Sequence, residues 1–550
     1  NMGVLKWDVP DGEWIILYTG MVPTGVKNSP TTPEGSGLEI DKMNKELAKF
    51  HFDSYIGELL NRLPADERKG LRHVVADSYE KGSENWTEGF AEDFKLTYGY
   101  DPHPWLPVLT GRIVENADRS ERFLWDMRRL IADRIASNYV GGLRERCEEY
   151  GLRLWLENYG HWGFPGEFLN YGGASHELGG EFWLSVPDRG KVEVRCASSA
   201  GHIYNKRVIS AEAFTSHWSF TQMHRDLKIK GDWSWCEGIN HFVMHVYLHQ
   251  PDERVPGISA WFGTDFNRHN TWFPYSKSYF DYIRRSCALL QSGSPVADVA
   301  YFIGEDVPKM TGDREPALPE GYDYDFINTE VLMKDARVID RRIVLSSGAS
   351  YAILVLPPKK TMRPETLAKI AELVKDGACI LGNPPEHSPS GRNYPECDNK
   401  IKALTKEMWG DHAQTLKGRR YGKGRIFAGV ELKEALTAIG VTEDCILPKD
   451  FLYTHRQEKH AHLYFVSNQQ NIACTDTIAF RVSDLQPELW NPVTGEIRTL
   501  TCYRIAKGKT YIPLEFGPGE SWFIVFRHKK IESAVGSNFP TQSLLLNIEG

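Results

Sequence analysis

The chain has 550 residues, which suits roughly three or four domains of ordinary size. A hydrophobic content of 41% and a charged content of 25% exclude a disordered chain. The net charge of −8, without a cluster of Lys and Arg, argues against a nucleic-acid surface, and no run approaches the ~20 consecutive apolar residues of a membrane span. The cysteines are scattered without a CxxC pair, which argues against a zinc site and a disulfide framework.

Strand-like and helical runs alternate over the first half of the chain. The runs that predict strands are residues 14–20, 71–79, 152–158, 181–186, 207–214 and 240–248. Amphipathic stretches such as 41–63 and 120–150 predict helices between them. This alternation, with carboxylates at strand ends, predicts a (β/α)8 TIM-type barrel over residues 1–292. A closed barrel has eight strands, so two strands either are hidden or lie upstream of Asn1.

The remaining residues predict different architectures. Residues 293–448 contain nearly continuous apolar runs around a helical stretch, as in a small doubly wound, flavodoxin-like α/β domain. Residues 449–535 contain short alternating strands broken by Asn, Gly and Pro, as in a β-sandwich. The apolar segment 536–550 looks like the start of a further β segment.

Acidic side chains at strand ends are the main functional signal. Glu80 closes the run that begins at Leu71, and Glu212 interrupts the run 207–214. Either residue alone is read most simply as a surface carboxylate that caps a strand. Together, one acid that protonates a leaving oxygen and one carboxylate that activates water are the equipment of glycoside hydrolysis. Further carboxylates at predicted strand ends are Asp77, Glu157 and Glu181.

If these strands are neighbours in one barrel, the carboxylates converge on one pocket. Crowded like charges raise the pKa of at least one of them, which helps a carboxyl group to act as a general acid. The same crowding offers hard oxygen ligands, and these favour calcium or magnesium over zinc.

Histidines and aromatic residues give weaker signals. His241, His245 and His249 recur every fourth residue, and a core or subsite role is favoured over metal binding because no HExxH is present. His202, with Tyr204 close by, is a candidate for hydrogen bonding a substrate hydroxyl. Aromatic residues make 12% of the chain. Those beside polar residues suit sugar rings, although most large aromatics belong to cores; they include Trp86, Trp162, Trp218, Trp233, Trp235, Trp261 and Trp272.

Several loop segments, in order along the chain, resemble glycoside hydrolase family 106. They include Pro10-Asp-Gly-Glu-Trp14, Thr32-Pro-Glu-Gly-Ser-Gly-Leu-Glu-Ile-Asp-Lys42, Asp77-Ser-Tyr-Glu80, Arg122-Phe-Leu-Trp-Asp126, Ala200-Gly-His-Ile-Tyr204, Ala211-Glu-Ala-Phe-Thr215 and Gly238-Ile-Asn240. The resemblance runs over nearly the whole chain and is densest over residues 10–300. It implies a bacterial, inverting, calcium-dependent α-L-rhamnosidase that acts on plant polysaccharides or glycosides, in the periplasm or outside the cell.

The resemblance also implies roles for residues. It makes Glu80 the acid on the fourth barrel strand and Glu212 the base on the seventh, with Asp77, Glu157, His202 and Tyr204 as substrate-binding residues. The run 14–20 then becomes the third strand, and the first two strands belong to an N-terminal region before Asn1 that the rest of a longer protein supplies. The calcium ligands are expected to include Glu181 first, with Glu157 and Asp126 behind it.

Two alternatives stay open. The same scaffold could hydrolyse another glycoside, such as a uronide or another deoxysugar, because fold does not fix the substrate. The chain could also be a catalytically silent carbohydrate-binding protein, although such a protein has no need of both Glu80 and Glu212.

Overall fold

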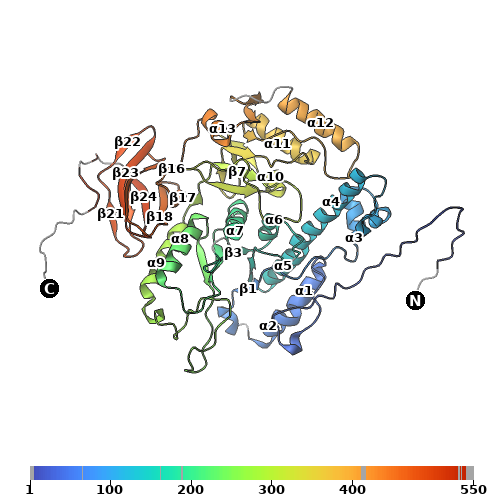
Figure 1. Cartoon of the computed structure of the whole chain (residues 1–550), viewed down its shortest axis with the longest axis horizontal. Helices are drawn as coiled ribbons and strands as arrows, with labels where there is room; N and C mark the ends of the chain where they lie inside the picture. Colours follow the sequence, from blue (N-terminus) through green and yellow to red (C-terminus); the bar gives the residue numbers. More distant parts are fainter. Residues whose placement is uncertain are drawn as a thin grey trace.

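A curled sheet of five parallel strands forms the centre of the first half of the chain (Figure 1). The computed structural model describes residues 5–64, 66–161, 163–186, 190–410, 417–529, 533 and 536–539. The strands follow one another across the sheet in chain order: β1 (His73–Ala76), β2 (Arg153–Glu157), β3 (Glu177–Trp183), β4 (Ile209–Thr215) and β5 (His241–Met244). This arrangement is half of a barrel, and alternate side chains face its concave side.

Helices precede, connect and follow these strands, and the connecting ones make the crossovers that parallel strands require. They are α1 (Lys45–Phe52), α2 (Glu58–Arg62), α3 (Phe90–Tyr98), α4 (Ala117–Arg134), α5 (Gly141–Glu149), α6 (Phe168–Gly173), α7 (Lys191–Ile203), α8 (His224–Cys236) and α9 (Lys277–Leu290). Helix α7 buries Val194, Ala197 and Ala200, which recur at a spacing that places them along one side of a helix. None of the helices in the described part of the chain combines the length and the apolar character that a bilayer crossing requires.

The structure corrects two of the strand predictions. Residues 14–20 form no strand, and Tyr18 among them is 93% exposed. Apolar and β-branched residues suit a sheet, but a strand also needs a neighbouring edge to pair with, and this segment has none among the described residues. Strand β3 begins at Glu177, earlier than 181, because Gly179 and Gly180 belong to the strand and not to a turn. The half-barrel therefore has five strands where six were expected.

A second, mostly parallel sheet follows the half-barrel, in the order β14-β15-β13-β12-β7-β8. Its strands are β7 (Val299–Phe302), β8 (Tyr324–Ile327), β12 (Ile353–Val355), β13 (Cys379–Leu381), β14 (Arg419–Tyr421) and β15 (Gly424–Phe427). A small sheet of β9 (Arg337–Ile339), β10 (Arg342–Val344) and β11 (Ser350–Tyr351) accompanies it. The helices are α10 (Thr329–Lys334), α11 (Pro364–Asp376), α12 (Glu396–Trp409) and α13 (Leu432–Ala438).

Two antiparallel sheets enclose a third core at the C-terminal side of the described chain. Their strands are β16 (Cys445–Ile446), β17 (Phe451–Glu458), β18 (Ala461–Asn468), β19 (Cys474–Phe480), β20 (Leu485–Trp490), β21 (Ile497–Thr499), β22 (Arg504–Ala506), β23 (Lys509–Phe516) and β24 (Ser521–Lys529). The short β6 (Ser294–Pro295) adds to β17, so the chain leaving α9 is tied to this region. Of the predicted further β segment, residues 536–539 form no strand and 540–550 lie outside the described residues.

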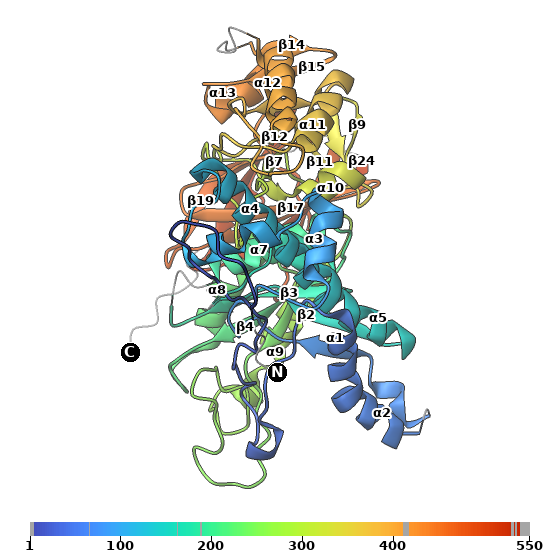
Figure 2. The ribbon, with the colours of Figure 1, turned by 90° about the vertical axis from the view of Figure 1, so that its right-hand side faces the viewer.

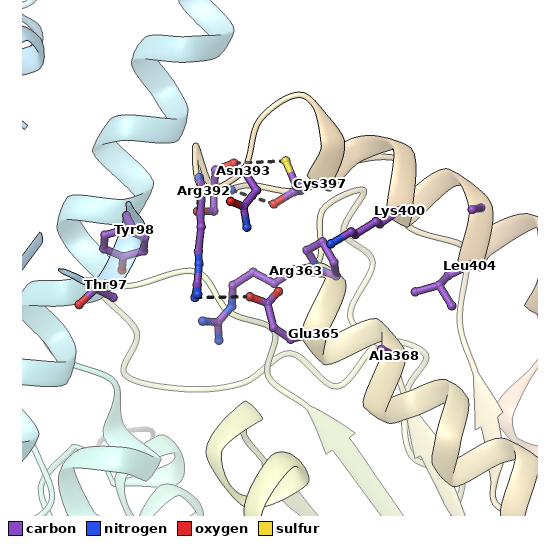
Figure 3. A pocket seen from close by; sticks show the side chains of 14 residues that line it. Thr97, Tyr98, Arg363, Glu365, Ala368, Arg392, Asn393, Cys397, Lys400 and Leu404 are labelled. Atoms are coloured by element: carbon purple, nitrogen blue, oxygen red, sulfur yellow. Dashed lines mark hydrogen bonds and ion pairs between the residues drawn. The ribbon is translucent and has the colours of Figure 1, made fainter. Parts of the chain in front are cut away.

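The three parts pack against one another. Helices α11, α12 and α13 lie at one end of the molecule and α2 at the other (Figure 2). A pocket of about 490 Å³ separates the end of α3 from α11 and α12 (Figure 3). Arg122 of α4 crosses to the second sheet, where its guanidinium bonds to the Ser388 carbonyl at 2.7 Å and to Asp398 at 2.8 Å. The parts of the chain thus share buried polar contacts as well as apolar ones.

Candidate active site

Acidic side chains gather at the carboxyl ends of the half-barrel strands, which is the functional end of such folds. Asp77 follows β1 directly, and Glu157 is the last residue of β2. Glu181 of β3 lies in register with Glu212 of β4. A cavity of about 540 Å³ opens on the concave face and is lined by Asp77, Glu157 and Glu212 together with other side chains of the strands. The structure therefore brings together the strand-end carboxylates that the sequence singles out.

Glu157 is the most deeply buried of these carboxylates, with 2% of its surface exposed. Its Oε2 accepts a hydrogen bond from the Ser78 amide at 3.1 Å, whereas Oε1 has no partner among the described residues. Burial raises the pKa of Glu157 well above its usual range, and a hydrogen bond with Asp77 and the nearby charges of Glu212, Asp77 and Glu181 raise it further. The surroundings of Glu157 thus favour its protonated form, and its Oε1 is buried in the site.

Glu212 of β4 lines the same cavity as Glu157 and has two close partners. The Thr215 hydroxyl donates to its Oε1 at 2.5 Å, and Nδ1 of His245 lies 3.8 Å from the same oxygen. Burial raises the pKa of Glu212; His245 and the Thr215 hydrogen bond oppose that rise, and the charges of Asp77 and Glu80 add to it. The effect of Glu80 on the pKa of Glu212 indicates that the two carboxylates lie near each other.

A bulge in β4 produces the contact between Thr215 and Glu212. In a regular strand, residues three apart point to opposite faces. Phe214 is the extra residue opposite β3, and its φ of +72° is in the left-handed region that bulky residues rarely adopt. The Thr264 hydroxyl donates to the Phe214 carbonyl at 2.6 Å and holds this conformation. The bulge turns Thr215 back toward the carboxylate.

Glu80 is held by the loop that continues β1. Tyr79 bridges to Gly160 of the loop after β2, and the amide of His161 donates to the Tyr79 carbonyl at 3.0 Å. The Ser78 hydroxyl donates to Oε1 of Glu80 at 2.8 Å, and Nε2 of His161 lies 3.2 Å from that oxygen. Sequence reasoning missed His161, although its place just after a strand that ends in Glu157 is a usable signal.

An aromatic row begins beside Glu181. The indole N–H of Trp183 donates to the Glu181 carboxylate, and the Trp183 and His217 rings lie 4.6 Å apart. His217 in turn stacks on Trp261, with centroids 6.4 Å apart and planes inclined by 15°, and Trp261 is exposed. Of the other candidate aromatics, Trp235 belongs to the buried core and Trp162 lies outside the described residues.

The structure places His202 and Tyr204 away from this site. The Nδ1 of His202 lies 2.8 Å from Asp325, and the Tyr204 hydroxyl donates to Glu330 at 2.8 Å, so both side chains contact the second sheet and its helix. The physical reason is topological: residues at the end of α7 precede β4 and lie at its amino end, opposite the carboxyl end that carries Glu212. These contacts do not support a role in substrate binding, which stays a prediction for both residues.

Asp126 also makes its contacts outside the carboxylate cavity. It is fully buried in α4 and accepts hydrogen bonds from the Ser390 hydroxyl at 2.5 Å, the Gly391 amide at 2.9 Å and the Tyr100 hydroxyl at 2.8 Å. Burial raises its pKa to about 6 against these hydrogen bonds. Asp126 joins α4 to the second part of the chain, and the structure does not bring it beside Glu181.

Carboxylates gathered in one cavity could also hold a cation. Among the described residues, no three Asp, Glu, His or Cys side chains converge in a way that could hold a metal ion. The expected pairing of Glu181 with Asp126 is absent, and one Glu181 oxygen accepts from Trp183. Calcium therefore stays a prediction of the family resemblance, with Glu181 and Glu157 as the expected ligands near this site.

Comparison with known proteins identifies a family and several relatives. A family model described as alpha-L-rhamnosidase matches residues 1–505. A curated protein of Formosa agariphila named putative beta-glucuronidase is 36% identical over 97% of this chain and 45% of its own length. The rhamnosidase structure from Novosphingobium sp. PP1Y superposes with a TM-score of 0.88 at 33% identity, over 94% of this chain and 50% of that one. A β-galactosidase from Bacillus circulans sp. alkalophilus shares the fold alone, with a TM-score of 0.55 at 11% identity over 90% of this chain and 85% of that one.

The chain thus spans about half the length of the Formosa agariphila protein and of the Novosphingobium rhamnosidase. The family model covers most of the 550 residues, including every strand of the half-barrel and both Glu80 and Glu212. The chain therefore belongs to glycoside hydrolase family 106, the α-L-rhamnosidase family.

Proposed function

We propose that the protein removes terminal α-L-rhamnose from plant polysaccharides or glycosides with inversion of configuration, Glu80 acting as the acid and Glu212 as the base. The observation that carries this proposal is the placement of both glutamates at the carboxyl ends of one parallel sheet, close enough for the charge of Glu80 to act on Glu212. An acid and a base on opposite sides of a glycosidic bond need carboxyl groups roughly 6.5–9.5 Å apart, which leaves room for water.

The role of each glutamate follows from its surroundings. Glu212 accepts the Thr215 hydrogen bond and faces His245, and both stabilise the ionised form that a base requires. Glu80 is partly exposed beside His161, which can return a proton to it. Burial of Glu212 acts in the other direction and suits an acid, so the role assignment needs its own test.

The first experiment combines substitution with stereochemistry. Glu80→Gln and Glu212→Gln should each lower kcat on an α-L-rhamnoside by about 10²–10⁴-fold with the thermal midpoint unchanged, because general acid–base groups contribute that much. Proton NMR of the first-formed sugar should show the β-anomer. Net retention, or a variant that keeps more than about 10% of wild-type kcat, would contradict the proposal.

A second experiment separates the acid from the base. An activated leaving group such as dinitrophenolate departs without protonation, so Glu80→Gln should regain much of its turnover on a dinitrophenyl rhamnoside. Glu212→Gln should stay inactive on the same substrate because water activation is still missing. If Glu212→Gln regains turnover and Glu80→Gln does not, Glu212 is the acid and Glu80 is the base. The assignment as a hydrolase would be unchanged.

Calcium enters the proposal through the family resemblance and is tested separately. Treatment with a chelator followed by calcium readdition should abolish and restore activity, and Glu181→Ala should weaken calcium binding measured by calorimetry. Full activity in the presence of the chelator would remove calcium from the proposal.

A glucuronide is the second candidate substrate, because a relative carries that name. Among the described residues, the basic side chains that pair with the carboxylates of this site are the histidines His161 and His245. A uronate would have to be accommodated beside several carboxylates of its own charge sign, which favours the neutral rhamnose as the first candidate. Turnover measured on a panel of aryl rhamnosides, glucuronides and other deoxysugar glycosides decides between the substrates. Sugar binding without turnover of any of them would favour a carbohydrate-binding protein.

The setting of the whole protein is also a proposal. Val75 and Val243 on the concave face are 61% and 42% exposed, although barrel interiors are normally filled. We propose that a further region of a longer protein covers this face, and that the enzyme works in the periplasm or outside the cell. Activity of the 550-residue chain alone, compared with that of the longer protein, tests the first of these points.

A further inference from the structure

A second cavity lies at the opposite end of the half-barrel from the carboxylates. It measures about 370 Å³ and opens where the chain enters β4, leaves α9 and pairs β6 with β17. The side chains that bear on its chemistry come from the half-barrel, from the chain after α9 and from the third core: His202, Arg207, Ser292, Ser294, Arg456 and Glu458. All three parts of the molecule meet here, since Ser347 of the second part also lines the cavity.

Arg456 is the unusual residue in this cavity. It is 7% exposed, and its Nε and Nη2 donate to the carbonyls of Ser292 at 2.6 Å and Gly293 at 2.7 Å. No described carboxylate forms an ion pair with it, although buried charges are normally paired. Burial and the neighbouring cation of Arg207 lower the pKa of Arg456 to about 10. The charged group that affects the pKa of Arg456 is therefore another cation, Arg207, and not a carboxylate.

Two further groups in the cavity have unused hydrogen-bonding capacity. Arg207 donates from Nε to the Gln291 carbonyl at 3.1 Å, and its other N–H groups make no bond to a described residue. The Nε2 of His202 is buried without a partner, while its Nδ1 is held by Asp325. Glu458 is the carboxylate of the lining, and it is exposed and forms no ion pair within the described part of the chain.

The simplest explanation of the two arginines is that they cap helix α9. Their three bonds do end on consecutive carbonyls just after its last turn. A helix C-terminus carries about half a negative charge, however, and two guanidinium groups carry two positive charges. The helix end therefore offsets only part of the guanidinium charge, and several N–H donors of the two arginines make no bond to a described residue.

We propose that this cavity binds a small oxyanion of the phosphate or sulfate class, held by the free N–H groups of Arg207 and Arg456 beside His202. Guanidinium groups bind such oxyanions through paired, charge-assisted hydrogen bonds. The ion would neutralise the buried charge and join the half-barrel to β17 of the third core. Its effect is on the packing of the domains, so it is independent of the proposed hydrolysis.

The pocket between α3 and the helices α11 and α12 serves as a comparison (Figure 3). Its arginines have carboxylate partners: Nε of Arg363 lies 2.6 Å from Glu305, and Nη1 of Arg392 lies 3.8 Å from Glu365. Arg392 is an exposed arginine that lines a pocket, as Arg207 is. Arg392→Gln is therefore a matched control for Arg207→Gln.

The experiment measures the thermal midpoint and calorimetric binding of the whole chain with inorganic phosphate, against sodium chloride at equal ionic strength. Phosphate should raise the midpoint of the wild type and of Arg392→Gln alike. In Arg207→Gln the dissociation constant should rise about tenfold or more, because a charge-assisted hydrogen bond is worth at least that factor. His202→Gln is the second variant and should also weaken binding. It keeps the test available if Arg207→Gln fails to fold.

Inorganic sulfate and a sugar monosulfate form parallel arms. Binding of inorganic ions supports a free ion as the natural ligand, and binding of the sugar monosulfate alone supports an oxyanion carried on a glycan. The proposal is overturned if neither phosphate nor the sulfates exceed chloride in the wild type, or if Arg207→Gln and His202→Gln bind as the wild type does.

Discussion

At the scale of single residues, one hydroxyl group controls the carboxylate assigned as the base. Thr215 reaches Glu212 because the bulge at Phe214 adds a residue to β4. Phe214 is buried with a strained backbone, and the Thr264 hydroxyl holds its carbonyl. This backbone conformation places the Thr215 hydroxyl where it stabilises the ionised form of Glu212.

Thr215→Val should therefore shift the pH dependence of activity. The Thr215 hydrogen bond lowers the pKa of Glu212, so its loss raises that pKa. A base acts in its ionised form, and activity falls as pH drops through its pKa. The acid limb of kcat/KM should move to higher pH by about one unit, since a hydrogen bond to a charged group is worth about 1.5–3 kcal/mol. Thr215→Ser keeps the hydroxyl and should leave the limb in place; equal profiles for both variants would contradict this account.

At the scale of elements, the glycines of β3 set the distance between the sheet and α7. A side chain at Gly180 would place its Cβ 2.7 Å from the Glu193 carbonyl oxygen of α7, and one at Gly179 would reach 2.5 Å from the Trp155 ring. Both contacts are closer than real Cβ atoms allow. Helix α7 packs directly on the strand backbone as a result.

Gly180→Ala should destabilise the fold by about 1–3 kcal/mol, because the neighbouring atom is backbone and cannot rotate away. Gly37→Ala is the matched control, since a Cβ there meets nothing within 4 Å. Urea unfolding followed by tryptophan fluorescence measures both. A Gly180→Ala protein as stable as the control would show that α7 can shift outward.

These elements also show how far the sequence predicts the molecule. The runs ending near Glu80 and around Glu212 identify real strands because apolar periodicity and a terminal carboxylate are local signals. The start of β3 was missed because glycines indicate a turn locally, whereas here the contact with α7 requires them. His202 and Tyr204 contact the second sheet and its helix, and the sequence could not indicate this because proximity to β4 does not say at which end of the strand a residue lies.

At the scale of the whole molecule, buried ion pairs connect the parts of the chain. Arg129 of α4 donates to Glu167 at 2.7 Å with both side chains nearly buried. The other oxygen of Glu167 accepts from Asn328, which precedes α10 in the second part of the chain, at 2.8 Å. One carboxylate thus holds two helices of the half-barrel and the neighbouring sheet in a fixed arrangement.

Glu167→Gln should cost about 3–5 kcal/mol of unfolding free energy because it leaves Arg129 buried with one partner fewer, and the retained Asp133 contact favours the lower end. Glu145→Gln, which breaks partly exposed pairs with Lys45 and Lys49, should cost less, about 1 kcal/mol. Denaturant unfolding at pH 7 compares them. Equal losses for the two variants would contradict a linking role for Glu167.

The open edges of the half-barrel favour self-association of this chain in solution. The outer edges of β1 and β5 carry backbone groups that no other described strand pairs. Such edges are templates for association between copies, and the exposed valines beside them strengthen that tendency. Light scattering should detect self-association that grows with protein concentration, and Val75→Lys should suppress it by placing a charge at the edge.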